Sequence, residues 1–197
     1  MSILERNDSK LASFLFRGQL TQNSIDSLPQ SSRETKELDF SAVAQKVSLK
    51  ELDDDSVNAA TKMSAVYIAI AAFENMVRQL ILDKMLEEKG ADWWDSCVAN
   101  DIQKRVTKKI EDEKQIRWHK PRGVSPIFFT EMKDLVSIIQ NNWDVFEDVF
   151  ADVEWVRHNV RALERSRNVI MHSGELSLDD IERVGVIIRD WIRQVGV

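Results

Sequence analysis

Apolar residues recur at helical spacing through most of the chain after residue 55. One stripe predicts a helix from about Val57 to Glu88, ended by Gly90, because its apolar residues share a single face. The stripe consists of Ala60, Met63, Tyr67, Ile70, Val77 and Ile81. Glu74 lies on the same stripe, and a carboxylate buried there needs a partner. The long helix is therefore expected to carry one acidic side chain into the core.

Four further helices follow from the same periodicity and from capping signals at the breaks. The predicted helices are Asn100–Gln115, a helix that is capped by Thr130 and carries Met132, Leu135, Val136, Ile138 and Ile139, Val153–His172 capped by Asp152, and Leu178–Val195 begun by Ser177 with Asp180. No segment alternates as a strand does, and no internal repeat is present. The predicted fold class is all-α, an antiparallel bundle of four or five helices.

The first 55 residues follow a different pattern. Leu11, Phe14, Leu15 and Phe16 predict a short amphipathic helix, and a polar stretch over 24–41 follows as a connector. We therefore expect two parts: an additional N-terminal helical arm or linker over 1–55, a candidate for contact with a partner, and the helical bundle over 56–197.

Composition narrows the function classes. A net charge of −6 over 197 residues argues against a general nucleic-acid coat protein, so any contact with RNA must be local. The single cysteine, Cys97, excludes an internal disulfide and a cysteine zinc cluster, and the three scattered histidines show no ligand spacing. We expect no metal, no cofactor and no membrane contact. The N-terminus lacks a signal-peptide pattern, so a cytoplasmic location is expected.

Basic residues form a stripe beside the apolar face of the helix predicted over Val153–His172. The stripe consists of His158, Arg161, Arg165, Asn168 and His172. Arg167 instead lies on the apolar side, where a partly buried guanidinium needs a carboxylate or a phosphate. Glu74, also on an apolar stripe, is the candidate partner.

The hexamer Arg167-Asn168-Val169-Ile170-Met171-His172 carries the chemistry of a candidate site. A guanidinium can clamp a phosphate with two parallel hydrogen bonds, and an imidazole can move a proton near neutral pH. The alternative is that the spacing of the arginine and the histidine arose by chance and that His172 has no catalytic role, because the C-terminal end of a helix favours cations. Lys104, Arg105, Lys108 and Lys109 alternate with acidic residues, which is typical of a solvated face, with an RNA-backbone rail as the lesser alternative.

The hexamer resembles the Arg-Asn-x-x-x-His signature of the HEPN superfamily, small helical domains that include metal-independent ribonucleases. Longer stretches resemble its Swt-type branch over roughly Ala59 to Gln194. These stretches are Trp118–Gly123, Pro126–Thr130, Asp134–Leu135, Asn141–Trp143 with Phe146, Leu163–His172, Leu176–Ser177 and Asp180–Arg183.

The resemblance implies a homodimer in which two motif helices face one cleft. It also implies RNA cleavage without metal, by attack of the 2′-hydroxyl on the adjacent phosphorus. Arg167 would bind the phosphate, His172 would be the general acid or base, and Asn168 would orient one of them. His158, Arg161 and Arg165 would line the shared basic cleft. Some members carry a tyrosine two residues after the histidine, which an antitoxin modifies; that position here is Gly174.

Three function classes remain open. The first is a metal-independent endoribonuclease, either a toxin controlled by an antitoxin or a phage-defence effector. The second is a catalytically silent HEPN module that binds RNA or a partner protein, and the third is a structural adaptor. The intact Arg167, Asn168 and His172 favour the first class, whereas the acidic net charge favours the other two.

Overall fold

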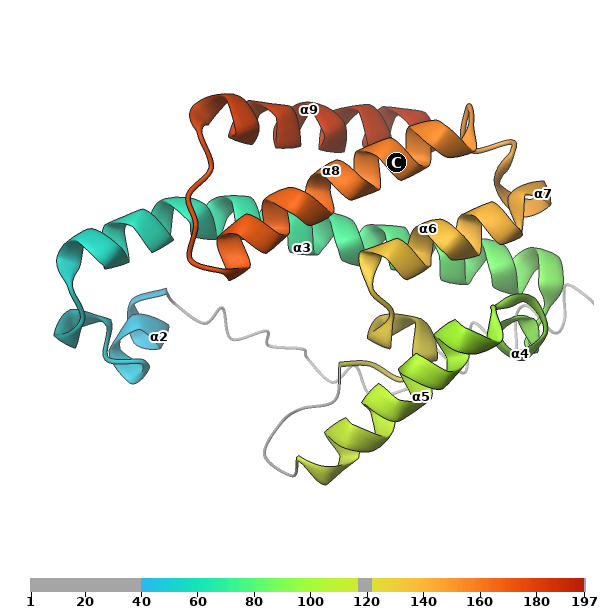
Figure 1. Ribbon diagram of the computed structural model, residues 1–197, viewed down its shortest axis with the longest axis horizontal. Helices are drawn as coiled ribbons and strands as arrows, with labels where there is room; N and C mark the ends of the chain where they lie inside the picture. The colour runs from blue at the N-terminus through green and yellow to red at the C-terminus, as the bar shows by residue number, and fades with distance from the viewer. Residues whose placement is uncertain (1–39, 117–121, 197) are drawn as a thin grey trace, which may run out of the picture. The chain divides into compact units, whose positions relative to one another are not determined.

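The computed structural model describes residues 40–116 and 122–196 (Figure 1). Within these ranges every regular element is a helix, which confirms the all-α prediction. The chain divides into two units, Met1–Leu52 and Asp53–Val197. The described part of the first unit holds α2 (Phe40–Lys46) and the short 3-10 helix η1 (Leu49–Glu51). The amphipathic helix predicted around Leu11 lies outside the described residues, as do residues 118–121 of the stretch Trp118–Gly123.

Helix α3 runs from Asp54 to Lys89 and is the longest helix of the second unit. The Asp53 side chain caps it by accepting a hydrogen bond from the Ser56 backbone N–H at 2.9 Å. The helix ends at Gly90, whose φ of 81° is in the region that only glycine adopts without strain. The predicted stop is confirmed, and the start lies three residues before the predicted Val57.

The remaining helices follow in short succession. They are α4 (Trp93–Cys97), α5 (Asn100–Gln115), η2 (Pro126–Phe129), α6 (Met132–Asn141), α7 (Trp143–Phe146), α8 (Val153–Met171) and α9 (Leu178–Val195). In Figure 1 the long helices α3, α5, α6, α8 and α9 alternate in direction, as an antiparallel bundle requires. The predictions for α5 and α9 are confirmed at both ends, and α8 ends one residue earlier than predicted.

The start of α6 differs from the prediction. Thr130 does not cap this helix: its hydroxyl donates to the Ile127 carbonyl at 2.6 Å and so closes η2 instead. The cap residue is Glu131, whose backbone N–H donates to the Asp134 side chain at 3.0 Å. The one-residue shift places the Glu131 side chain at the N-terminus of α6, where it becomes part of the candidate site.

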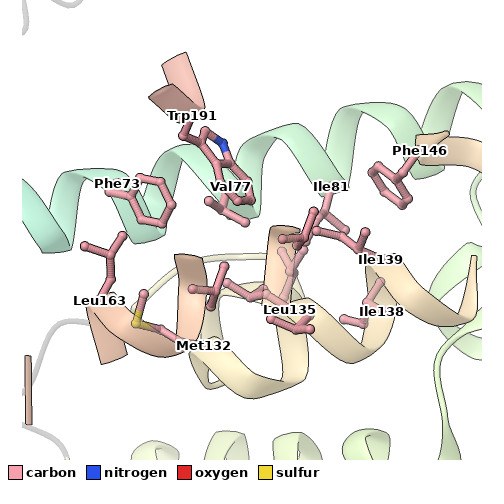
Figure 2. Close-up of a cluster of buried hydrophobic side chains, with 14 of the residues drawn as sticks. Phe73, Val77, Ile81, Met132, Leu135, Ile138, Ile139, Phe146, Leu163 and Trp191 are labelled. Carbon is pink, nitrogen blue, oxygen red and sulfur yellow. The ribbon is translucent and has the colours of Figure 1, made fainter. Parts of the chain in front are cut away.

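The core lies between α3 and the helices that cover it. Figure 2 shows Phe73, Val77 and Ile81 of α3 together with side chains from α6, α7, α8 and α9. These partners are Met132, Leu135, Ile138, Ile139, Phe146, Leu163 and Trp191, each almost fully buried. Trp191 packs edge-on against Phe73 with ring centroids 5.0 Å apart. Trp155 of α8 stacks on Trp191 with ring centroids 5.4 Å apart, and Leu163 of α8 is buried in the same cluster, so the core sets the position of the motif helix.

Helix α3 is also long and apolar enough to cross a membrane by length and composition alone. One third of its most apolar 18-residue window is buried inside the bundle, and the core helix of a globular protein meets the same criterion. Its buried face contacts α6, α7, α8 and α9. We therefore interpret α3 as the central helix of the bundle.

Candidate functional site

Helix α8 separates a buried face from an exposed basic face, as its sequence pattern predicts. Val156, Val160 and Leu163 are buried. The predicted stripe on the other side is exposed at all five positions: His158, Arg161, Arg165, Asn168 and His172. Arg167 lies between the two faces, with about one third of its side chain exposed.

Arg167 meets the carboxylate of Glu74 from α3. Its Nε lies 3.8 Å from Glu74 Oε2, while the other carboxylate oxygen accepts a hydrogen bond from Arg78. Arg78 also donates to the Thr130 backbone carbonyl at 2.9 Å, which ties α3 to the start of α6. Glu74 is therefore a buried carboxylate between two guanidinium groups, and its contact with Arg167 is the looser one. A phosphate can approach Arg167 while Arg78 keeps Glu74 neutralised.

These groups lie on the wall of a cavity of about 540 Å³ between α3, α5, α6 and α8. Its described lining contains five cations, three carboxylates, one threonine and one asparagine. The cations are Arg78, Lys109, Arg122, Lys133 and Arg167; the other lining residues are Glu74, Glu131, Glu164, Thr130 and Asn168. The excess of positive charge stands in contrast to the net charge of −6 of the whole chain. Arg122 is paired with Glu113 outside the lining, and the remaining local excess of positive charge makes the cavity a candidate site for an anion.

Two lysines from different elements converge on Glu131 at the mouth of this cavity. Lys109 of α5 contacts Glu131 Oε1 at 2.8 Å, and Lys133 of α6 contacts Oε2 at the same distance. Hydrogen bonds from Lys109 and then from Lys133 lower the pKa of the Glu131 carboxyl from 4.5 to about 2. Glu131 thus stays ionised over the whole physiological range and keeps its ion pairs with both lysines.

This low pKa predicts a pH-dependent contribution of Glu131 to stability. Because its pKa is lower in the folded protein than in the unfolded chain, the contribution is present above about pH 4.5 and is lost as the pH falls towards about 2. The difference in unfolding free energy between the wild type and Glu131→Gln should therefore shrink as the pH falls. Urea unfolding at several pH values measures it. Glu111→Gln, which removes a carboxylate with no ion pair among the described residues, should show no such trend.

His172 takes a different position from Arg167. It is the C-terminal cap residue of α8, is exposed, and does not line the described wall of the cavity that contains Arg167 and Asn168. The structure therefore brings Glu74, Arg167 and Asn168 together at one cavity and places His172 about one turn further along the helix. Within one chain the acid–base candidate and the phosphate-binding candidate do not share a cavity.

The turn after His172 is closed by backbone hydrogen bonds. The N–H of Gly174 donates to the Val169 carbonyl at 2.8 Å, and the N–H of Ser173 donates to the Ile170 carbonyl at 3.0 Å. This pair of bonds is the Schellman motif, in which the residue after the cap is left-handed; here it is Ser173, with φ of 61°. A β-carbon at Gly174 would lie 2.9 Å from the Val169 carbonyl oxygen and 2.7 Å from its Cγ1. Only glycine fits at position 174 without displacing the turn.

The other predicted support residues lie along the exposed stripe and not at the cavity. His158, Arg161 and Arg165 make no ion pair with any residue in the described ranges. Arg165 lines a separate hollow of about 270 Å³ between α8 and α9, together with Asp180. These three exposed side chains are available to a ligand or partner that covers α8 from outside.

Sequence reasoning missed most of the cavity wall. Arg78 was detectable, because it follows Glu74 by four residues and so shares its helix face. Lys109, Lys133 and Glu131 carry no such signal, since α5 and α6 meet only in the folded bundle. In chemical terms the wall offers charge-assisted hydrogen bonds to an anion. Within residues 40–116 and 122–196, no group of three or more His, Cys, Asp or Glu side chains is arranged to hold a metal ion.

Comparison with known proteins identifies the family. No curated protein and no solved structure matches the chain. Residues 69–196 match the family described as Swt1-like HEPN, and this range contains Glu74, the cavity and the whole motif helix. The matched segment covers more than half of the 197 residues. The chain therefore belongs to the Swt1-like HEPN family.

Proposed function

We propose that the protein is a metal-independent endoribonuclease of HEPN type that acts as a cytoplasmic toxin or phage-defence effector. Membership of the family supports a ribonuclease-type or RNA-binding module in general. The observation that carries the more specific proposal is the partly exposed Arg167, which is set against the buried Glu74 on the wall of a cationic cavity. A partly exposed guanidinium in this position can donate two parallel hydrogen bonds to the oxygens of a phosphate.

The proposed reaction needs no group beyond the RNA and the side chains of the motif. The ribose 2′-hydroxyl loses a proton to a general base, and its oxygen attacks the neighbouring phosphorus. The bond from phosphorus to the 5′-oxygen breaks, and a general acid protonates that oxygen. The products are a 2′,3′-cyclic phosphate and a 5′-hydroxyl. Arg167 stabilises the charge on the phosphorane, and His172 transfers the protons.

In a homodimer, His172 of one chain could reach the cavity of the other chain, although it does not line the cavity of its own. HEPN domains often dimerise and bind RNA, and a second copy facing the exposed side of α8 would bring its own His172 towards the Arg167 of the first. In this proposal each of the two sites combines Arg167 of one chain with His172 of the other, and that histidine takes the proton of the 2′-hydroxyl and returns one to the leaving oxygen. Arg161, Arg165 and His158, which make no ion pair with any described residue, would line the shared cleft, where the two guanidinium groups would neutralise RNA phosphates.

A catalytically silent module that binds RNA or a partner protein, such as an antitoxin, is the second candidate. The position of His172 outside the cavity of its own chain favours this alternative. A cavity that holds Arg167 and Asn168 without an imidazole can bind a phosphate without cleaving RNA.

Cleavage of cellular RNA in the presence of EDTA tests the proposal. We expect the wild-type protein to cut total RNA without added metal and to leave cyclic phosphate and 5′-hydroxyl ends. Mapping of the fragment ends by ligation before and after removal of the cyclic phosphate checks the chemistry. Intact RNA after incubation with a folded, RNA-binding protein would instead support the silent module.

A further inference from the structure

We propose that Lys109 and Lys133 form a second phosphate subsite, which holds a non-scissile phosphate of single-stranded RNA while Arg167 binds the scissile one. The inference rests on the proposed function, since it assigns a flanking part of the same substrate to the far side of the same cavity. Lys109 and Lys133 lie on α5 and α6, and Arg167 lies on α8, so the cavity spans the two positions.

The charges around the two lysines leave room for a phosphate. One carboxylate, Glu131, pairs with both ammonium groups, so the trio keeps one net positive charge. An ammonium group has three hydrogen-bond donors. Lys109 uses two of them, on Glu131 at 2.8 Å and on the Phe129 carbonyl at 3.5 Å. The ammonium group of Lys133 has an ion pair with Glu131 alone among the described residues, and the side chain is well exposed. Both lysines can therefore donate to a phosphate without releasing Glu131.

The lining also indicates which part of RNA the cavity takes. The volume of about 540 Å³ is that of a small-ligand pocket, which admits one extruded nucleotide but no duplex. Every described lining residue is charged or polar, and none is aromatic or aliphatic. Base recognition in single strands relies on stacking against aromatic side chains, whereas this wall offers only groups that bind phosphate and sugar. The subsite should therefore bind RNA with little dependence on sequence.

Neighbouring lysines of α5 provide a matched control. Lys108 carries the same charge on the same helix, but it lines a separate hollow with Asn100 and Glu111. If only the net charge of the surface matters, Lys108→Ala and Lys109→Ala should lower the affinity for RNA equally. If Lys109 belongs to a phosphate subsite, only Lys109→Ala should lower it.

The test is binding of a fluorescent 2′-O-methyl RNA of about ten nucleotides, which cannot be cleaved because it lacks the attacking hydroxyl. Fluorescence anisotropy should show about tenfold weaker binding for Lys109→Ala and for Lys133→Ala, and unchanged binding for Lys108→Ala. Each of the two weakened variants should also lower the slope of log affinity against log salt by about 0.7, the value for one lost phosphate contact. Lys109→Arg should keep most of the affinity.

Glu131→Gln gives a prediction of opposite sign. Removal of the carboxylate frees both lysines, so this variant should bind the same RNA several-fold more tightly than the wild type. A purely structural role of the trio would leave binding unchanged or weaken it. Circular dichroism and thermal melting establish that each variant is folded before binding is compared.

The outcomes separate this inference from the proposed function. Equal affinity of wild type, Lys109→Ala and Lys133→Ala would overturn the subsite, even if the wild type cleaves RNA. Equal weakening by Lys108→Ala would overturn it as well. If the wild type cleaves no RNA, but Lys109→Ala and Lys133→Ala bind RNA more weakly than the wild type, the subsite is retained and the ribonuclease proposal is removed.

Discussion

His172→Ala should reduce the rate of RNA cleavage by about a hundredfold or more, the usual loss when an acid–base group is removed. The side chain is exposed at the end of α8 and supports no core contact, so the variant should fold and melt like the wild type. Binding of uncleavable RNA should change little, because the phosphate-binding groups lie in the cavity and not at the helix end.

The rate is measured under single-turnover conditions on one defined RNA, with His158→Ala as the matched control. His158→Ala removes an imidazole from the same exposed stripe about 20 Å away along α8. Its proposed role is in RNA binding, so the single-turnover rate at saturating protein should stay close to that of the wild type. Equal rates for wild type and His172→Ala would remove this histidine from the mechanism.

A mixing experiment tests whether the site is shared between two chains. If Arg167 of one chain acts with His172 of the other, a mixed dimer of Arg167→Ala and His172→Ala has one intact site. Equal mixing of the two inactive proteins should then restore about a quarter of the wild-type activity, since about half of the dimers are mixed and each has one of two sites. No recovery in a mixture that exchanges subunits would place both residues in one chain.

Arg167→Ala should lower kcat by about a hundredfold to a thousandfold, as the loss of a preorganised group facing transition-state charge does. The fold should survive, because Arg78 keeps its hydrogen bond to the buried Glu74 after Arg167 is removed. Arg167→Lys should recover only part of the rate, since an ammonium group keeps the charge but cannot form two parallel hydrogen bonds.

The measurement is kcat and KM at fixed salt, with Arg193→Ala as the control. Arg193 is exposed on α9 and does not line the cavity, so its loss changes the net charge by the same amount without removing a residue of the site. A loss that appears in KM alone, with kcat preserved, would assign Arg167 to substrate binding rather than to the transition state.

The elements that are periodic over several turns were predictable from the sequence. The ranges of α5 and α9 match the predictions, and the Asp152 cap and the Ser177–Asp180 pair at the helix starts are both present. These features depend on residues within a few positions of one another. The contact of Arg167 with Glu74 was also accessible, because a charged residue on each of two apolar stripes suggests that the two meet.

Features that arise from tertiary packing were not predictable in the same way. The short helices α4 and η2 are stabilised by the side chains they bury, such as Trp93 and Ile127, rather than by propensity. The Lys109–Glu131–Lys133 trio joins α5 to the start of α6, and Lys109 and Glu131 lie 22 positions apart in the sequence. Glu131 is the cap residue of α6, one position after the predicted cap Thr130. Nothing local in the sequence marks Lys109 as different from Lys108.

The closed turn at the end of α8 restricts how this chain can vary. Position 174 lies two residues after the histidine, where some HEPN proteins carry a modifiable tyrosine, yet the Val169 carbonyl leaves no space for a β-carbon there. In a library of all substitutions, variants at Gly174 should therefore fold poorly, because their β-carbon has no space beside the backbone. Ser173→Gly should fold and raise the free energy of unfolding, because glycine adopts the left-handed conformation of this residue without strain. A tyrosine at position 174 would place its β-carbon against the Val169 carbonyl, so the turn as folded here leaves no place for a side chain that an antitoxin could modify.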